Sequence, residues 1–452
     1  MSEAMLNHGN NPLVVPQAGI VRPSKADGDK AQQDIKAAVH RELIKRLDLE
    51  KLGMMQESKG ASQELFGVIQ QLISEHDTPL SSFERFQLAG QVLDEVFGLG
   101  PLEPLLQDST ISDILVNGCD QVYVERRGRL EKCNVVFKDD RHLMHVIDKI
   151  VSAVGRRIDE SSPMVDARLK DGSRVNVIIP PLAIDGPVLS IRKFGSKPLQ
   201  AQDLINHRAL TQPMLDVLQA AVRARMNIII SGGTGAGKTT LLNVLSSFIP
   251  ESERVVTIED SAELQLKQEH VVRLECRPPN VEGKGAIRQR ELVINALRMR
   301  PDRIVLGEIR GAEALDMLQA MNTGHDGSVT TLHANTPRDA MSRLEMMAMM
   351  SDVGTSEKAI RSQIASAIDL VIQVARMSDG SRRVTHITEL TGTQIDIISM
   401  QDIFLFEKQG LGPEGKVRGR FRSTGIVPKC AERFAEAGIP LPAGMLDHNM
   451  AV

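Results

Sequence analysis

The feature that most constrains this fold is a glycine-rich segment that lies between two apolar stretches. Residues 228–230 are three consecutive isoleucines, which is typical of a strand buried on both faces of a parallel sheet. The residues after them have the spacing G-x-x-x-x-G-K-T, and apolar residues then recur at helical spacing from Leu241 until Pro250. The stretch therefore predicts a strand, a tight turn and a helix in immediate succession.

The turn has the residue types that hold a polyphosphate, and we call residues 232–240 the phosphate loop. Glycines let successive backbone N–H groups converge on one point, and the following helix adds the positive end of its dipole. The lysine can bridge the β- and γ-phosphates, and the adjacent threonine hydroxyl can reach Mg²⁺. We therefore predict an ATP site, with Lys238 also catalytic and Thr239 also a metal ligand, formed by Gly232, Gly233, Thr234, Gly235, Ala236, Gly237, Lys238, Thr239 and Thr240.

The alternative is a chance match in a glycine-bearing loop. The chain has 35 glycines in 452 residues, so a chance match to this spacing is rare, and both flanking elements argue against it.

Composition excludes several classes of function. The net charge is −4, with no Trp and one Tyr, so a dedicated nucleic-acid binder is disfavoured. The four cysteines have no C-x-x-C spacing, which disfavours a zinc site or a disulfide framework and suits a reducing cytosol. No apolar run approaches the length of a membrane span, and no signal peptide is evident. We expect a cytoplasmic protein that meets any membrane only peripherally.

The segments before the phosphate loop predict three parts. Residues 1–30 are polar and read as a disordered tail. Residues 31–97 have helical periodicity, with a capping box at residues 81–84, and predict a helical subdomain. The simpler interpretation is that these helices form a structural subdomain; the alternative is that they bind a partner protein.

Residues 98–197 predict an α+β domain. Short strands are expected at 114–116, 122–124 and 135–137, a helix at 141–154, and a hairpin around Asp171-Gly172. Three arginines lie on or beside these strands, and they either face solvent at a sheet edge or reach the phosphates across a cleft: Arg168, Arg174 and Arg192. Residues 198–442 then form the predicted nucleotide-binding domain, and residues 443–452 a flexible tail.

Two further apolar runs end in acids, as strands of a parallel sheet do beside a ligand. Residues 255–258 lead into Glu259-Asp260, and residues 303–306 lead into Gly307-Glu308. This order predicts a RecA-like core. Many such cores have an Asp-Glu pair where this chain has Gly307-Glu308, so Glu259 or Asp260 must supply the missing carboxylate. We predict metal binding by Thr239, Glu259, Asp260 and Glu308, although a helix N-cap also explains the acids at 259–260.

Two histidines flank a short predicted strand at residues 328–332. Three interpretations are open for His325 and His333: a pair of zinc ligands, core or turn residues, or a sensor of the γ-phosphate. We favour the sensor, because this strand should lie beside the phosphate loop. The methionine-rich helix that follows, residues 341–350, reads as core or subunit interface, with a docking surface as the alternative.

Four blocks in fixed order resemble the ATPases of type II and type IV secretion systems and type IV pili. They are the phosphate loop, an acidic block at 257–263, a Gly-Glu strand end at 305–310 and a histidine block at 323–335. The chain looks most like the tight-adherence (Flp) pilus assembly ATPases, the CpaF/TadA group, over residues 81–441. The segments that carry this finer resemblance are residues 113–118, 122–128, 276–280, 296–302 and 315–325.

The resemblance implies a fold and a motor. It implies a RecA-like P-loop NTPase core in the C-terminal domain, preceded by an α+β N-terminal domain and a helical extension. It implies a homohexamer that works peripherally at the inner membrane, hydrolyses ATP and pushes on platform proteins, which pass pilin outward.

The catalytic residues expected in such a motor are a water-activating acid and arginines. Glu308 is our first candidate for the acid and Glu259 the second, while Arg277 and Arg310 lie in the core blocks. Two other functions stay open. One is a type IV secretion ATPase that moves DNA or effectors, and the other is a nucleotide-gated scaffold that hydrolyses little.

Overall fold

The computed structural model describes residues 35–36, 38–39, 42–43, 59–75, 80–126, 128–194, 198–279, 284–351 and 354–446. The tail predicted over residues 1–30 lies outside this range, as do residues 447–452 of the tail predicted over residues 443–452. The chain divides into two compact units, residues 1–108 with 135–137, and residues 109–134 with 138–452. The boundaries that we placed at residues 97 and 197 stay predictions.

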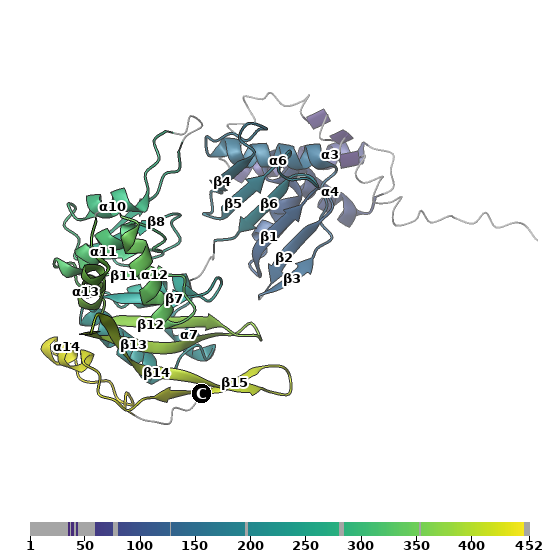
Figure 1. Ribbon diagram of the computed structural model, residues 1–452. Helices are drawn as coiled ribbons and strands as arrows, with labels where there is room; N and C mark the ends of the chain where they lie inside the picture. Colours follow the sequence, from purple (N-terminus) through teal and green to yellow (C-terminus); the bar gives the residue numbers. More distant parts are fainter. Residues whose placement is uncertain are drawn as a thin grey trace, which may run out of the picture. The chain divides into compact units, whose positions relative to one another are not determined.

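The first unit is helical (Figure 1). It contains α3 (Lys59–Ser74), α4 (Ser82–Phe97), the 3₁₀ turn η1 (Gly100–Leu102) and α5 (Glu103–Gln107). Apolar residues four apart on α3 and α4 pack together, among them Ile69 and Val92, which are fully buried. The predicted capping box is confirmed, because the Ser81 hydroxyl accepts from the Glu84 amide and the Glu84 carboxylate accepts from the Ser81 amide.

We expect Asp94→Asn to stabilise this unit at pH 7. Burial, with help from Glu103, raises the pKa of Asp94 to about 6. The folded carboxyl therefore holds its proton better than the unfolded one, and stability falls as pH rises from about 4 to about 6. Asparagine removes this loss, which we put at about 1 kcal/mol after allowing for solvent screening. Hydrogen exchange of the α4 amides should slow at pH 7 and match wild type at pH 4; equal exchange at both pH values would contradict the prediction.

The second unit begins with a six-stranded antiparallel sheet in the order β3-β2-β1-β6-β5-β4. The strands are β1 (Ile111–Asn117), β2 (Val122–Arg126), β3 (Arg129–Lys132), β4 (Met164–Arg168), β5 (Arg174–Ile178) and β6 (Val188–Arg192). Helix α6 (Asp140–Ala153) presents a buried apolar face that includes Leu143 and Ile147. The predicted hairpin at Asp171-Gly172 is confirmed, since β4 pairs with β5 across it.

The strand that we predicted at residues 135–137 is wrong. The third strand is β3, at residues 129–132, because the turn at residue 128 folds the chain back at once. All four β3 residues are exposed, so the sequence there lacks the alternation that reveals a half-buried strand. Residues 135–137 form no strand, and Phe137 is buried.

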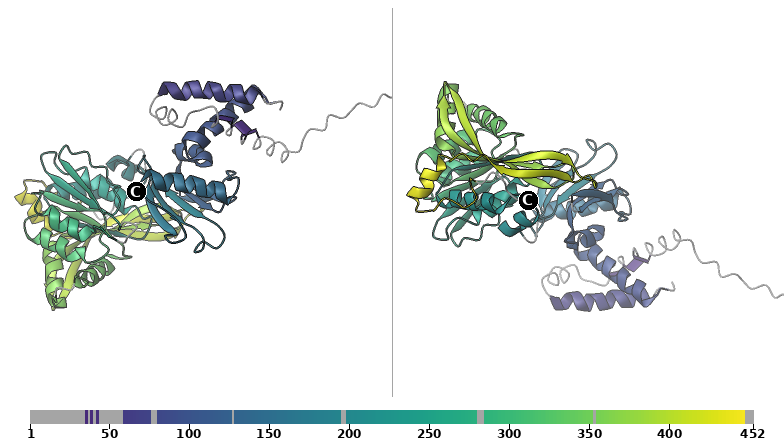
Figure 2. Two further views of the ribbon diagram at one scale, coloured as in Figure 1. Left: turned by 90° about the horizontal axis from the view of Figure 1, so that it is seen from above. Right: turned by 90° about the horizontal axis from the view of Figure 1, so that it is seen from below.

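The rest of this unit is a nine-stranded sheet in the order β15-β14-β13-β12-β7-β11-β10-β8-β9. The six strands from β12 to β9 are parallel: β7 (Ile228–Gly232), β8 (Val255–Glu259), β9 (Val271–Glu275), β10 (Arg303–Leu306), β11 (Val329–Leu332) and β12 (Leu370–Arg376). The other three are antiparallel and extend the sheet (Figure 2): β13 (Arg382–Gln394), β14 (Ile397–Leu411) and β15 (Val417–Ser423).

Helices cover both faces of this sheet. They are α7 (Ala201–Asn206), α8 (Gln212–Arg223), α9 (Lys238–Ser246), α10 (Gln289–Ala296), α11 (Glu313–Asn322), α12 (Pro337–Met349), α13 (Glu357–Ala367) and α14 (Cys430–Glu436). Ile228 and Ile230 share a core with α8 and α9, whereas Ile229 belongs to the core with α11 to α13. The isoleucine run is thus buried on both faces, as predicted, and β7 is the central strand of the nine-stranded sheet.

The methionine-rich helix is α12, and its methionines divide between core and surface. Met341 and Met347 are buried, which confirms the core interpretation for that face, while Met346, Met349 and Met350 are exposed. In the part of the chain that the structure describes, no helix combines the length and apolar character needed to cross a bilayer.

Candidate active site

The phosphate loop follows β7 and leads directly into α9, as the sequence predicts. Gly235 (φ 68°) and Gly237 (φ 99°) have left-handed backbone conformations, which residues with a Cβ adopt only with strain. At Gly232 a Cβ would lie 2.4 Å from the carbonyl oxygen of Val374 on the neighbouring strand β12. The glycines are therefore required by the turn and by close strand packing.

Lys238 lies at the first position of α9 and is only 8 % exposed. Its Nζ donates to the carbonyl oxygen of Gly233 at 3.2 Å and lies 3.3 Å from both ring nitrogens of His333. Burial lowers the pKa of Lys238, and the nearby Glu308 carboxylate counteracts this. The ammonium is thus held at the loop by a carbonyl on one side and an imidazole on the other.

Glu308 connects this lysine–histidine pair to an arginine. Its Oε1 lies 3.1 Å from His333 Nε2, and its Oε2 accepts from Arg310 Nη2 at 3.1 Å. Arg310 Nη1 in turn lies 3.0 Å from Asp260 Oδ2. We call Lys238, His333, Glu308, Arg310 and Asp260 the charge relay row. Its members follow β7, β11, β10 and β8, which are neighbours, so their carboxyl ends meet at one edge of the sheet.

The surroundings of His333 favour its neutral form. Burial lowers its pKa, and the positive charge of Lys238 lowers it further. A neutral ring has one donor and one acceptor. With Nε2–H donated to Glu308, Nδ1 is left to accept from Lys238.

Glu259 is 3 % exposed and has two different oxygens. Its Oε2 accepts from the amides of Glu263 (2.7 Å) and Leu264 (2.9 Å), which fixes the turn after β8. Its Oε1 is buried and has no hydrogen-bond partner among the described residues. Burial raises the pKa of Glu259, and the two amides counteract that rise. One carboxylate oxygen is therefore left for a ligand.

The side chain of Glu259 explains why position 307 is a glycine. A Cβ at this position would lie 3.1 Å from Glu259 Cγ, which is tighter than ordinary packing. The larger side chain of an aspartate would compete with Glu259 for the same space. The strand end therefore has glycine after β10 and a buried glutamate at the end of β8. That Glu259 or Asp260 supplies the missing carboxylate stays a prediction.

We expect Gly307→Ala to displace Glu259 and to destabilise the domain by about 1–3 kcal/mol, as overpacking does. A melting temperature lower by several degrees should accompany a loss of ATP turnover. Gly233→Ala is the control for stability alone, because a Cβ at Gly233 meets nothing within 4 Å. An alanine at 307 that leaves both melting temperature and turnover at wild-type values would contradict this account.

The residues present fit Mg²⁺ bound mainly through phosphates. No cluster of three or more potential metal ligands occurs within the described part of the chain. Mg²⁺ usually keeps several waters and takes one or two protein oxygens beside those of a nucleotide. Thr239, in the first turn of α9, and the unpartnered Oε1 of Glu259 suit that role. Asp260 and Glu308 are already paired with Arg310, so their place as metal ligands stays a prediction.

Two predicted catalytic residues are not brought to the phosphate loop. His325 precedes β11 and so lies at its amino end, whereas the loop follows the carboxyl end of the parallel strand β7. Its amide donates to the carbonyl of Ala320. Arg277 lies beyond β9 and donates to the carbonyl of Gly285 at 2.7 Å. His325 lies at the opposite end of its strand from the phosphate loop, whereas Arg277 follows the edge strand β9, which β8, β10 and β11 separate from β7.

The three arginines of the antiparallel sheet meet carboxylates. Arg174 Nε lies 3.1 Å from Glu263, and Arg174 Nη2 donates to the carbonyl of Ser261. Arg168 pairs with Glu275 at 3.2 Å. Arg192 instead pairs with Asp113 on β1, within its own sheet. Arg168 and Arg174 thus reach the segments around β8 and β9, and their role in nucleotide binding stays a prediction.

Sequence reasoning missed two other arginines. Arg376 ends β12 and Arg382 begins β13, and both lie against the phosphate loop. Because β12 runs parallel to β7 and beside it, its carboxyl end falls next to the loop. The sequence does show an arginine at the end of the mostly apolar run 370–375. It does not show that this strand pairs with β7, which is what brings the arginine to the phosphate loop.

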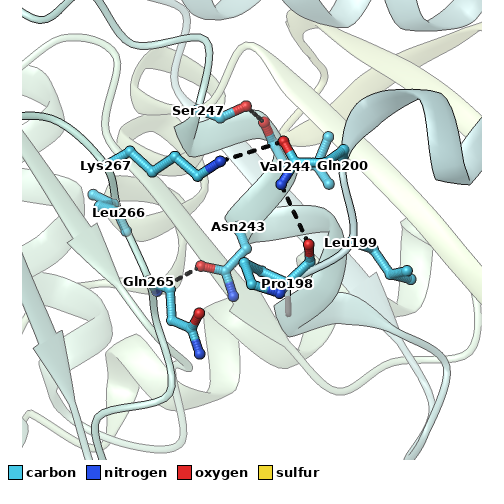
Figure 3. A pocket seen from close by; sticks show the side chains of 9 residues that line it. All are labelled: Pro198, Leu199, Gln200, Asn243, Val244, Ser247, Gln265, Leu266 and Lys267. Atoms are coloured by element: carbon cyan, nitrogen blue, oxygen red, sulfur yellow. Dashed lines mark hydrogen bonds between the residues drawn. The ribbon is translucent and has the colours of Figure 1, made fainter. Parts of the chain in front are cut away.

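A small pocket lies along α9 beyond its first turn (Figure 3). It is formed by residues 198–200, by Asn243 and neighbours on α9, and by residues 265–267. Asn243 Oδ1 accepts from the amide of Gln265 at 2.8 Å, and Lys267 Nζ donates to Gln200 at 3.5 Å. The first contact joins the segment after β8 to α9, and the second joins it to the residue before α7.

The phosphate loop on a central parallel strand and acids on the neighbouring strand ends define a RecA-like P-loop ATPase. Residues 95–422 match the family model described as Type II/IV secretion system protein. The chain therefore belongs to the type II/IV secretion system protein family, and it is an ATP hydrolase with an α+β N-terminal domain and a C-terminal RecA-like domain. The resemblance to secretion ATPases that the sequence suggested is confirmed at this level.

Similar proteins are secretion and transfer components. The chain is 38% identical, over 302 residues, to a Mycobacterium tuberculosis protein provisionally named for conjugal transfer; the match covers 66% of this chain and 85% of that protein. It is 30% identical, over 325 residues, to the type IV secretion system protein VirB11 of Bartonella henselae, with 64% and 91% covered. The solved VirB11 ATPase of Brucella suis aligns at 28% identity and a TM-score of 0.36, covering 65% and 97%.

Proposed function

We propose that this chain is the hydrolytic motor of a secretion-type machine and that the charge relay row is its catalytic centre. The observation that carries the proposal is the continuous row of contacts from Lys238 through His333 and Glu308 to Arg310. It places an acid, a histidine and two cations at the helix N-terminus that receives phosphates. Phosphoryl transfer needs this kind of positioning and charge neutralisation.

In the proposed mechanism Glu308 orients the attacking water and accepts its proton. Lys238 and Arg310 stabilise the charge that develops on the γ-phosphate oxygens. Asp260 pairs with Arg310 and fixes its position. His333 contacts both Lys238 and Glu308, so a movement of the lysine would also move the acid. Mg²⁺, held by Thr239 and Glu259, would neutralise charge on the β- and γ-phosphates.

We propose that the chain assembles as a homohexamer at the cytoplasmic face of the inner membrane. The names of the relatives support a type IV secretion or conjugal client, whose cargo is protein or DNA. The second candidate client is a tight-adherence pilus, in which inner-membrane platform proteins would pass pilin outward. That finer assignment is supported by segments 276–280 and 296–302 of this sequence.

Steady-state ATP hydrolysis with Mg²⁺, together with mass from light scattering, tests the motor. Turnover by a hexamer supports the proposal. A well-formed ring that binds ATP and releases no phosphate would instead support the nucleotide-gated scaffold.

A gene deletion, complemented with wild type or Lys238→Ala, tests the client in cells. Wild-type-dependent transfer of DNA or effector protein supports a secretion client. Wild-type-dependent pilin on the cell surface, with transfer unchanged, supports the pilus.

A further inference from the structure

Arg376 and Arg382, which sequence reasoning missed, lie against the phosphate loop. Arg376 and Arg382 are register partners at the ends of β12 and β13, and the turn between them is residues 377–381. Strand β12 pairs with β7 as far as Val374 and Gly232, so the two arginines come immediately after that last pair.

Arg382 contacts the loop at the positions that have no side chain. Its Nε donates to the carbonyl oxygen of Gly235 at 2.9 Å. Its Cδ lies 3.3 Å from the place where a Cβ of Gly237 would be. Arg376 approaches the same loop without bonding to it, since its Nη1 lies 3.7 Å from the Cβ position of Gly235.

The Gly235–Ala236 peptide group, which Arg382 contacts, is linked by hydrogen bonds to Lys238. In a planar trans peptide the C=O of Gly235 and the N–H of Ala236 point in opposite directions. That N–H donates to the carbonyl oxygen of Gly233 at 3.3 Å. The same oxygen accepts from Lys238 Nζ at 3.2 Å. A hydrogen-bonded path therefore runs from Arg382, across one peptide group, to the lysine of the ATP site.

We propose that Arg382 is a positioning residue for the phosphate loop, which it holds in its phosphate-binding shape from the side opposite the nucleotide. The inference rests on the proposed function, since it assumes that this loop binds ATP. Arg382 acts on the loop rather than on the reacting atoms, so it contributes to nucleotide affinity more than to the chemical step. A lysine at this position keeps a donor for the Gly235 carbonyl but loses the fixed geometry of the guanidinium.

The test compares Arg382→Gln and Arg382→Lys with two matched controls. Arg376→Gln removes a charge near the same loop but leaves the bond to Gly235 intact. Arg420→Gln removes an exposed arginine that pairs with Glu407 on the antiparallel strands. Fluorescent ADP titration gives Kd, steady-state kinetics give kcat and KM for ATP, and thermal melting checks folding.

We expect Arg382→Gln to raise Kd and KM about tenfold, with kcat within about threefold of wild type. Arg382→Lys should recover part of the affinity, Arg376→Gln should change it less than threefold, and Arg420→Gln should match wild type. If Arg382→Gln lowers kcat about 100-fold at unchanged Kd, Arg382 touches the transition state and the positioning role is overturned. Equal loss in Arg382→Gln and Arg376→Gln would also overturn it in favour of a general charge effect.

This experiment separates the inference from the proposed function. Wild-type protein that binds no nucleotide contradicts the proposed function. Wild-type protein that binds and hydrolyses ATP, beside an Arg382→Gln variant with the same Kd, KM and melting temperature, contradicts the inference alone.

Discussion

Glu308→Gln should lower kcat for ATP hydrolysis by about 10²–10⁴-fold while ATP still binds, because it removes a general base and keeps the shape of the side chain. Glu308 lies between His333 and Arg310, at 3.1 Å from each. Glutamine can still accept from Arg310, so the arginine keeps one partner and Asp260 remains the other. The loss should therefore fall on the chemical step rather than on the architecture of the site.

Phosphate release under saturating ATP and Mg²⁺, beside a fluorescent nucleotide titration, measures both halves of this prediction. Glu407→Gln is the matched control, because Glu407 also has two basic partners, in its case Arg420 and Arg422, but lies on β14. Its kcat should equal that of wild type. If Glu308→Gln retains more than about a tenth of wild-type turnover, then another group, with Glu259 first among them, is the base. Glu259→Gln in the same assay would decide that point.

Lys238→Ala should raise the Kd for ATP about 100-fold, since it removes a buried cation that can make charge-assisted hydrogen bonds to phosphate oxygens. It should cost no stability. Burial lowers the pKa of this ammonium, which shows that the folded protein disfavours the charge. Removing it is expected to leave the melting temperature unchanged or slightly higher.

The control for this variant is Lys267→Ala, an exposed lysine that bonds to Gln200 on the same domain. Titration of both variants with fluorescent ADP and ATP, together with thermal melting, measures the effect. Nucleotide affinity within threefold of wild type in Lys238→Ala would contradict the assignment of residues 232–240 as the phosphate site. A melting temperature lower by many degrees would show instead that the lysine supports the fold.

Local sequence determined the parts of this site that depend on neighbours along the chain. The isoleucines of β7, the left-handed glycines at 235 and 237 and the first turn of α9 follow from periodicity and glycine conformation. The acids at the ends of β8 and β10 could be recognised in the same way, since each directly follows an apolar run. Each of these features depends on residues close to it along the chain.

Tertiary structure decided what depends on strand order and strand direction. His333 and His325 look equivalent in the sequence, yet only His333 contacts Lys238, because a four-residue strand separates the two histidines and leaves them at opposite ends. Arg382, 147 residues from Gly235, contacts it because β12 pairs with β7 and β13 with β12. Gly307 has its reason in a side chain on another strand, Glu259. Local residue patterns determined the elements and the phosphate loop, and long-range strand pairing decided which distant side chains complete the site.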